Sequence, residues 1–275
     1  MTSPTHRVAV AASILVAVVV PRAARAQHCH IDTPPPAGHA AADRVAVTIA
    51  TRWVAGSAEV PEITTPMTVA RGYQGVDLGV DVGWRRWTAS ARLGAYRVDD
   101  HGVGPDDLRL AGAVAVTPAR SPVTVRALVG ATMPTGDADA GRGMGHVMVV
   151  GGAVASGRVG RLTGDLTVAY ARALGSGAEH AAHIHGTDAW PLIDPMGAEE
   201  VTAEAGAAVA IGPRGLALRG GALVAEPVAM GERRLVVSGG AAFARGHYRI
   251  GAMVLAPAIG DVYTARGELE LAYRY

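Results

Sequence analysis

The segment that decides the fold class is the end of the sequence, Tyr263-Thr264-Ala265-Arg266-Gly267-Glu268-Leu269-Glu270-Leu271-Ala272-Tyr273-Arg274-Tyr275. Apolar residues and glycine occupy its odd positions, whereas its charged residues occupy even positions. This period of two is typical of a β-strand, because side chains on a helix repeat every 3.6 residues. A soluble sandwich would bury the apolar face, whereas a membrane barrel would turn it to lipid and the charged face to a polar lumen. The segment alone leaves both folds open.

This closing segment also resembles a known signal. A last strand with Gly267, alternating large apolar residues and a terminal aromatic residue looks like the C-terminal signal that outer-membrane barrels present to their assembly machinery. The chain ends in Tyr275, where that signal usually has Phe. The resemblance implies two partners, the lipid of the outer membrane and the barrel assembly machinery.

Residues 1–26 are predicted to be a signal peptide. Arg7 precedes an apolar run over 8–20, and Ala24-Arg25-Ala26 supplies a small-x-small cleavage pattern before Gln27. The alternative, an uncleaved membrane anchor, is disfavoured because a spanning helix needs about 20 apolar residues. The predicted organisation is therefore a signal peptide over 1–26, a segment containing Pro and His over 27–43, and one domain over 44–275.

The composition agrees with a membrane barrel and excludes other classes. Hydrophobic residues make up 49% of the chain, and no stretch after the leader is long and apolar enough for a transmembrane helix. The mean hydropathy is still +0.23, as expected when apolar residues are spread over many short strands. There is no basic patch, so we expect no nucleic-acid partner, and one cysteine excludes an intramolecular disulfide.

Periodicity predicts an all-β fold, a closed antiparallel transmembrane barrel of about twelve strands. The expected strands cover 44–53, 72–84, 87–97, 107–116, 123–132, 146–156, 161–173, 200–211, 215–226, 233–243, 246–256 and 263–275. Their connections alternate in length: 54–71, 98–106, 133–145 and 174–199 are long, those after strands 2, 4, 6, 8 and 10 are short, and those after strands 9 and 11 are intermediate. Long loops on one rim and tight turns on the other are typical of outer-membrane barrels, with both termini in the periplasm. A soluble periplasmic β protein is the alternative.

The charged face of these strands predicts the lining of the lumen. It mixes both signs, and we expect it to comprise Asp77, Asp81, Arg92, Arg109, Arg126, Asp165, Glu204, Arg219, Arg249, Arg266, Glu268 and Glu270. Two outcomes are open for a barrel of this size, which lies between filled eight-stranded barrels and open porins. The charges could pair across the interior and nearly close it, or they could line a narrow polar pore.

One loop motif suggests a family. Met133-Pro134-Thr135-Gly136-Asp137 follows a predicted strand and precedes a loop containing Gly141, Gly143 and Gly145. It is no phosphate-binding loop, because the Gly-Lys-Ser/Thr ending and the following helix are missing. The motif resembles a family of outer-membrane channel proteins named for the meta-pathway of phenol degradation. That resemblance implies passage of small molecules, including aromatic ones, and identifies no catalytic residue.

Histidines cluster in two places and predict metal binding as an alternative function. Loop 174–199 contains His180, His183 and His185, followed by Asp188 and Asp194. The segment after the leader contains His28, Cys29 and His30. Imidazoles and a thiolate at such spacing suit Zn²⁺ or copper. The alternative is that these histidines are incidental to polar connecting segments.

No catalytic site is predicted. An outer-membrane hydrolase would need a serine beside a histidine and a polar orienting group. Only Ser176, which shares a loop with His180, approaches that arrangement. The sequence therefore favours a narrow passive channel for small polar or amphipathic solutes, without a required cofactor, in the outer membrane.

Overall fold

The computed structural model of this chain describes residues 45–61, 68–174, 199–212, 215–228, 233–260 and 263–275. In these ranges the chain forms strands and a single turn of 3-10 helix, η1 (Ala138–Ala140). The strands are β1 (Ala46–Pro61), β2 (Thr68–Trp84), β3 (Trp87–Val98), β4 (Gly102–Pro105), β5 (Leu108–Ala115), β6 (Val123–Met133), β7 (Met148–Val159), β8 (Leu162–Ala173), β9 (Glu199–Ile211), β10 (Leu216–Pro227), β11 (Arg234–Arg245), β12 (Tyr248–Ile259) and β13 (Tyr263–Arg274).

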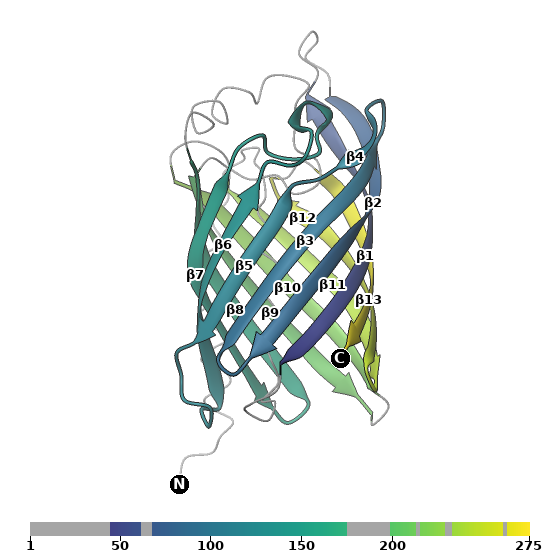
Figure 1. The fold of residues 1–275 in the computed structure, drawn as a ribbon. Helices are drawn as coiled ribbons and strands as arrows, with labels where there is room; N and C mark the ends of the chain where they lie inside the picture. The colour runs from purple at the N-terminus through teal and green to yellow at the C-terminus, as the bar shows by residue number, and fades with distance from the viewer. Residues whose placement is uncertain (1–44, 62–67, 175–198, 213–214, 229–232, 261–262) are drawn as a thin grey trace.

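The strands form one closed antiparallel barrel (Figure 1). Each strand pairs with its neighbours in the sequence, and β1 pairs with β13 from Thr48–Arg274 to Ala58–Tyr263, which closes the cylinder. The short strand β4 is additional: it pairs only with the end of β3, beyond the part of β3 that pairs with β5. The barrel therefore has twelve strands, and the predicted fold class is confirmed.

Two predicted connections are wrong in part. The expected loop 54–71 is mostly strand, because β1 continues to Pro61 and β2 begins at Thr68. The residues of β1 on the interior face here are Val54, Gly56 and Ala58, so the polar alternation that identifies a strand is missing. The expected loop 98–106 contains β4, whose four residues are too few to show a period.

The two rims differ as expected. The turns at 85–86, 160–161 and 246–247 lie at one end, here called the short-turn rim, together with the C-terminus (Figure 1). The connection 134–147 lies at the opposite end, the long-loop rim. Within the described ranges, no helix is of sufficient length and apolarity to cross a membrane.

The outer surface is apolar, and its aromatic residues are concentrated at one rim. Large apolar side chains are exposed at alternate positions, for example Val76, Leu78 and Val80 on β2. Aromatic residues near the short-turn rim are Trp84, Trp87, Phe243, Tyr248, Tyr273 and Tyr275. Tyr73 on β2 points inward and is only 4% exposed. The aromatic girdle is therefore densest at the short-turn rim.

Candidate functional site: the barrel interior

The register of the strands shows which side chains share the interior face. Directly paired residues on neighbouring strands point to the same face of the sheet. Starting from the buried Arg266, the successive partners across the strands are Leu255, Ser238, Gly221, Gly206 and Asp165. All these residues therefore point to the inside. We call the interior face of β13, β1, β2, β3 and β5 the charged wall, and the interior face of β7 to β11 the small-residue wall. Their central strands, β2 and β9, are six strands apart by either route around the barrel.

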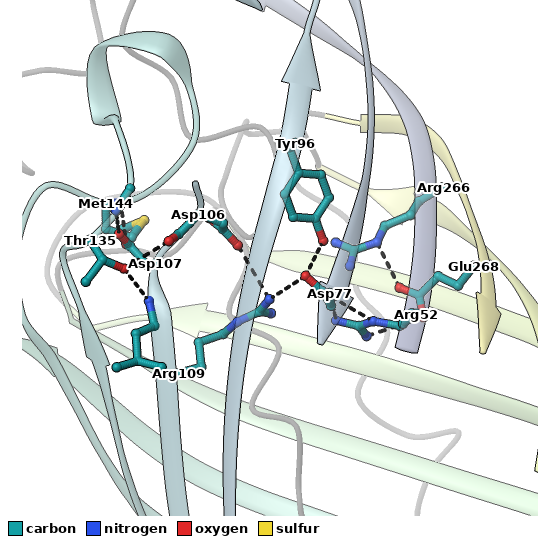
Figure 2. A network of polar contacts seen from close by, with 12 residues as sticks. Arg52, Asp77, Tyr96, Asp106, Asp107, Arg109, Thr135, Met144, Arg266 and Glu268 are labelled. Atoms are coloured by element: carbon teal, nitrogen blue, oxygen red, sulfur yellow. Dashed lines mark hydrogen bonds and ion pairs between the residues drawn. The ribbon is translucent and has the colours of Figure 1, made fainter. Parts of the chain in front are cut away.

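Asp77 on β2 is the centre of the charged wall (Figure 2). Arg52 on β1 donates to its Oδ2 from Nε and Nη2 at 2.9 and 2.5 Å. Tyr96 donates its hydroxyl to Oδ1 at 2.7 Å, and Arg109 donates to the same oxygen at 3.3 Å. The carboxylate is 1% exposed. A buried carboxylate is tolerated only when it is paired and hydrogen-bonded, and Asp77 satisfies both conditions.

The network extends along the wall in both directions. Arg109 also reaches Asp106 at 3.4 Å, and Arg52 reaches Glu268 on β13 at 3.4 Å. Glu268 in turn accepts a hydrogen bond of 2.9 Å from Arg266. Three arginines and three carboxylates are therefore linked (Figure 2), so the network carries no net formal charge.

Two glycines make room for the Tyr96 ring, which is fully buried. A Cβ atom built on Gly75 would lie 2.5 Å from the ring and 2.3 Å from the Ala95 carbonyl oxygen. One built on Gly94 would lie 2.5 Å from the ring and 2.5 Å from Asp77 Oδ1. All four distances are shorter than real Cβ contacts allow, so only glycine at these two positions leaves room for the ring against this part of the sheet.

The remaining interior ion pairs also run along the barrel wall. Arg92 lies 3.8 Å from Asp81 on the neighbouring strand, and Arg249 on β12 pairs with Glu270 at 2.5 Å. Arg234 on β11 pairs with Glu200 on β9, with both side chains 1% exposed. In each of these described pairs, the two partners lie on the same strand or at most two strands apart. None of these described pairs therefore crosses the interior.

The small-residue wall is different in kind. At mid-height its inward residues are mostly glycine, alanine and serine: Gly152, Ala169, Gly206, Ala208, Gly221, Ser238 and Gly240. Three charged residues expected in the lumen also lie on this face, namely Asp165, Glu204 and Arg219. None of the three makes an ion pair with another described residue, and Asp165 and Arg219 are exposed. At mid-height this wall therefore leaves space and keeps Asp165 and Arg219 in contact with solvent, whereas the Arg234–Glu200 pair nearer the long-loop rim is buried.

Arg126 on β6, between the two walls, is an exception. It points inward beside Ala115 and Val154, is 7% exposed, and makes no ion pair within the described residues. Next to it lies a small apolar cluster formed by Ala113, Leu128 and Val154. A buried cation in apolar surroundings is costly unless it is paired. Arg126 is therefore the described interior charge with the least compensation.

Toward the long-loop rim, the interior of the charged side is apolar. Val54, Tyr73, Tyr96 and Val98 of β1 to β3 form one cluster with Val236 and Leu255 of β11 and β12. At the short-turn rim the interior is hollow instead. A cavity of about 330 Å³ is lined there by residues that include Thr48, Asp81, Arg249 and Arg274. The interior thus has a cavity at the short-turn rim and is densely packed on its charged side toward the long-loop rim.

The loop with the Pro-Thr-Gly-Asp motif is attached to the break between β4 and β5. Asp107, which is buried, accepts hydrogen bonds from the Gly136 and Met144 N–H groups at 2.9 and 2.7 Å. The Thr135 hydroxyl donates to the Asp106 carbonyl at 2.9 Å and accepts from the Leu108 N–H at 2.8 Å. Burial raises the pKa of Asp107, and these N–H donors partly oppose the rise. The motif therefore fixes the loop to the rim.

Comparison with known structures identifies the fold. A crystal structure of an outer-membrane channel from Pseudomonas putida F1 matches with a TM-score of 0.62 and 12% identity, over 89% of this chain and 100% of that one. The translocator domain of the autotransporter NalP from Neisseria meningitidis matches with a TM-score of 0.50 and 15% identity, over 98% of this chain and 95% of that one. The fold is that of bacterial outer-membrane barrels.

Sequence comparisons find no relative of this chain. No family model matches the chain, and no curated protein matches it. The resemblance of the Pro-Thr-Gly-Asp loop to a channel family is nonetheless consistent with the Pseudomonas putida channel among the structures that share the fold.

The residues predicted to bind metal lie outside the described ranges. These are His28, Cys29 and His30 near the N-terminus and His180, His183 and His185 in the connection between β8 and β9, so Zn²⁺ or copper binding there stays a prediction. Ser176 also lies outside them. Among the described residues, no group of three or more His, Cys, Asp and Glu side chains is arranged to hold a metal ion.

The sequence did not reveal several interior residues. The sequence did not identify Arg52 because its neighbours on the interior face of β1 are Ala50 and Val54. A single charge among apolar residues does not mark a polar face. Asp106 precedes the predicted strand 107–116, so periodicity assigned it to no face. Asp107 was included in that strand, but the structure places it before β5, in the break after β4. Tyr96 lies within the predicted strand 87–97, but a large aromatic residue on the interior face gives no signal that distinguishes it from one facing lipid.

Proposed function

We propose that this chain is an outer-membrane protein that forms a narrow passive channel for small polar or amphipathic solutes. The single observation that carries the proposal is the asymmetry of the interior. Long charged side chains pair laterally along the charged wall, and at mid-height the inward residues of the opposite wall are mostly glycine, alanine and serine. A path for solutes therefore runs along the small-residue wall, past the solvent-exposed Asp165 and Arg219.

Three further observations support it. The outer surface is apolar, as a barrel in lipid requires. The cavity at the short-turn rim gives solutes a vestibule. A protein that shares the fold is an outer-membrane channel from Pseudomonas putida F1. In this proposal the short-turn rim faces the periplasm, the long-loop rim faces outward, and the last strand serves the assembly machinery.

The proposal includes removal of residues 1–26, which leaves 27–43 as a short segment before the barrel. Mass determination of the protein isolated from the outer membrane tests this directly, because cleavage after Ala26 gives a chain that begins at Gln27. A mass that includes the apolar run over 8–20 would contradict it and indicate an anchor.

Conductance across a planar lipid bilayer tests the function. We expect small, ohmic steps that do not depend on the sign of the voltage, because the described interior is rigidly paired. Faster migration of the unboiled protein on gels must accompany them, since this shows that the barrel is folded. A folded barrel without conductance at any voltage would contradict the channel and favour a structural or binding role.

A further inference from the structure

The end of the connection between β6 and β7 and the first residue of β7 carry soft or nitrogen donors at alternate positions, namely Met144, His146 and Met148. Met148 is fully buried and His146 is 7% exposed. The His146 Nε2 atom lies 3.2 Å from the Met148 Sδ atom. Met144 is half-buried and packs against the apolar cluster that contains Met148, Val150 and Ala169. The structure therefore gathers two thioethers and one imidazole at the long-loop rim.

The backbone around these residues is fixed on both sides. The Met144 N–H donates to Asp107 at 2.7 Å, and Met148 is the first residue of β7. Between them, the Leu174 N–H donates to the Val147 carbonyl at 2.9 Å. Gly143 and Gly145 have φ angles of 135° and 69°, which other residues rarely adopt, and they turn the chain on each side of Met144. The backbone that carries the three side chains is thus fixed, and two of the side chains, His146 and Met148, are already in contact.

The donor set selects the kind of ion. Thioether sulfur is a weak hydrogen-bond acceptor but a good ligand for soft cations, above all Cu(I). Zn²⁺ is usually bound by thiolate, imidazole or carboxylate, and Ca²⁺ and Mg²⁺ by oxygen. Asp107, the carboxylate that contacts the Met144 backbone, is already occupied by the N–H groups of Gly136 and Met144. We propose that Met144, His146 and Met148 form a binding site for a soft monovalent cation, Cu(I) or its mimic Ag(I).

These three residues are not among the histidines that the sequence predicted as metal ligands, and ion binding by them does not depend on the channel. The partial exposure of Met144 lets an ion meet this thioether first and then the more buried His146 and Met148. The rival explanation is structural: a hydrogen bond from His146 to Met148 sulfur could serve only to hold the loop. In that case the thioethers would respond to no ion.

Methionine methyl resonances distinguish the two explanations without any substitution in the protein that is titrated. The full chain is labelled with ¹³C in its methionine methyl groups, folded in detergent micelles and titrated with silver nitrate in chloride-free buffer. Single Met→Leu variants assign the signals. We expect the Met144 and Met148 methyl signals to shift together and saturate, while those of Met133 and Met253 stay in place. Unmoved signals at saturating Ag(I) would overturn the proposal.

Affinity measurements supply the second test. The background carries Cys29→Ser and His180→Ala, His183→Ala and His185→Ala, which removes the other predicted ligands. Adding Met144→Leu and Met148→Leu preserves volume and apolarity, and we expect Ag(I) affinity to fall at least about tenfold, the lower end for disturbing a metal site. Met133→Leu with Met253→Leu is the matched control. Equal affinities in the two doubly substituted proteins would also overturn the proposal.

Discussion

The charged wall and the small-residue wall face each other across one barrel, yet they are built by opposite means. On the charged wall Arg52, Asp77 and Glu268 are buried and linked. On the small-residue wall Asp165 and Arg219 remain in water without a partner among the described residues. The first arrangement stabilises the cylinder and fixes long side chains against it. The second leaves room. The comparison suggests that stability and passage are assigned to different sides of the interior.

The largest effect is expected from breaking the centre of the charged wall. Asp77→Asn would leave Arg52 and Arg109 without the carboxylate that both contact. Breaking a buried ion pair by removing one partner costs about 3–5 kcal/mol. Urea unfolding of the barrel in lipid vesicles measures the loss.

The matched control for Asp77→Asn is Asp165→Asn on the small-residue wall. Asp165 is exposed and unpaired among the described residues, so its change should stay within about 0.5 kcal/mol. Similar losses for the two variants would show that the walls do not differ in the way described.

A smaller loss is expected at the glycine beneath Tyr96. In Gly75→Ala the new methyl group would lie 2.5 Å from the ring. Overpacking of this kind costs about 1–3 kcal/mol. Gly151→Ala is the control, because nothing lies within 4 Å of a Cβ atom at that position on β7. Midpoints of heat-modifiable migration on gels compare the two, and an equal midpoint would mean that the ring moves away at no cost.

Removing the charge of Asp107 should loosen residues 134–147 without affecting the rest of the barrel. In Asp107→Asn the amide keeps one acceptor oxygen but turns an NH₂ group toward one of the two N–H donors, from Gly136 or Met144. An unsatisfied buried N–H costs about 1–3 kcal/mol. Hydrogen exchange should therefore accelerate in residues 134–147 and remain unchanged in β9 to β11. Unchanged exchange in the loop would show that Asp107 does not hold it.

The smallest effect concerns ion selectivity. Arg126→Gln removes an interior cation that has no described counter-charge, so the channel should shift toward cations. The double variant Arg249→Gln with Glu270→Gln removes both members of an ion pair and should not shift it. Reversal potentials in a KCl gradient measure both. A larger shift in the double variant would contradict the account of which charges are compensated.

Much of the fold could be predicted because a barrel strand carries its own signal. The period of two in β13, and the alternation of long and short connections, required no knowledge of long-range contacts. The signal failed where interior residues are apolar or small. Val54, Gly56 and Ala58 gave no contrast with the lipid face, so the extension of β1 was missed.

The candidate site was predictable only in part. Periodicity assigned charges such as Asp77, Glu268 and Arg266 to one face, but it could not show which of them pair. Pairing depends on register and shear between strands far apart in the sequence, such as β1 and β13. The same limit applies to Met148 and His146. Their contact depends on the conformation of the connection between β6 and β7. Asp107 fixes that conformation from the break between β4 and β5, far away in the sequence.

Conductance of two tryptophan variants on adjacent residues of β9 tests the central claim most directly. Ala208 points inward on the small-residue wall, beside Arg219, whereas Val209 is exposed on the lipid face. If solutes pass along the small-residue wall, Ala208→Trp should lower the single-channel conductance at least about twofold by narrowing the pore. Val209→Trp should leave it unchanged. Equal conductance in both folded variants and the native chain would contradict a path along this wall.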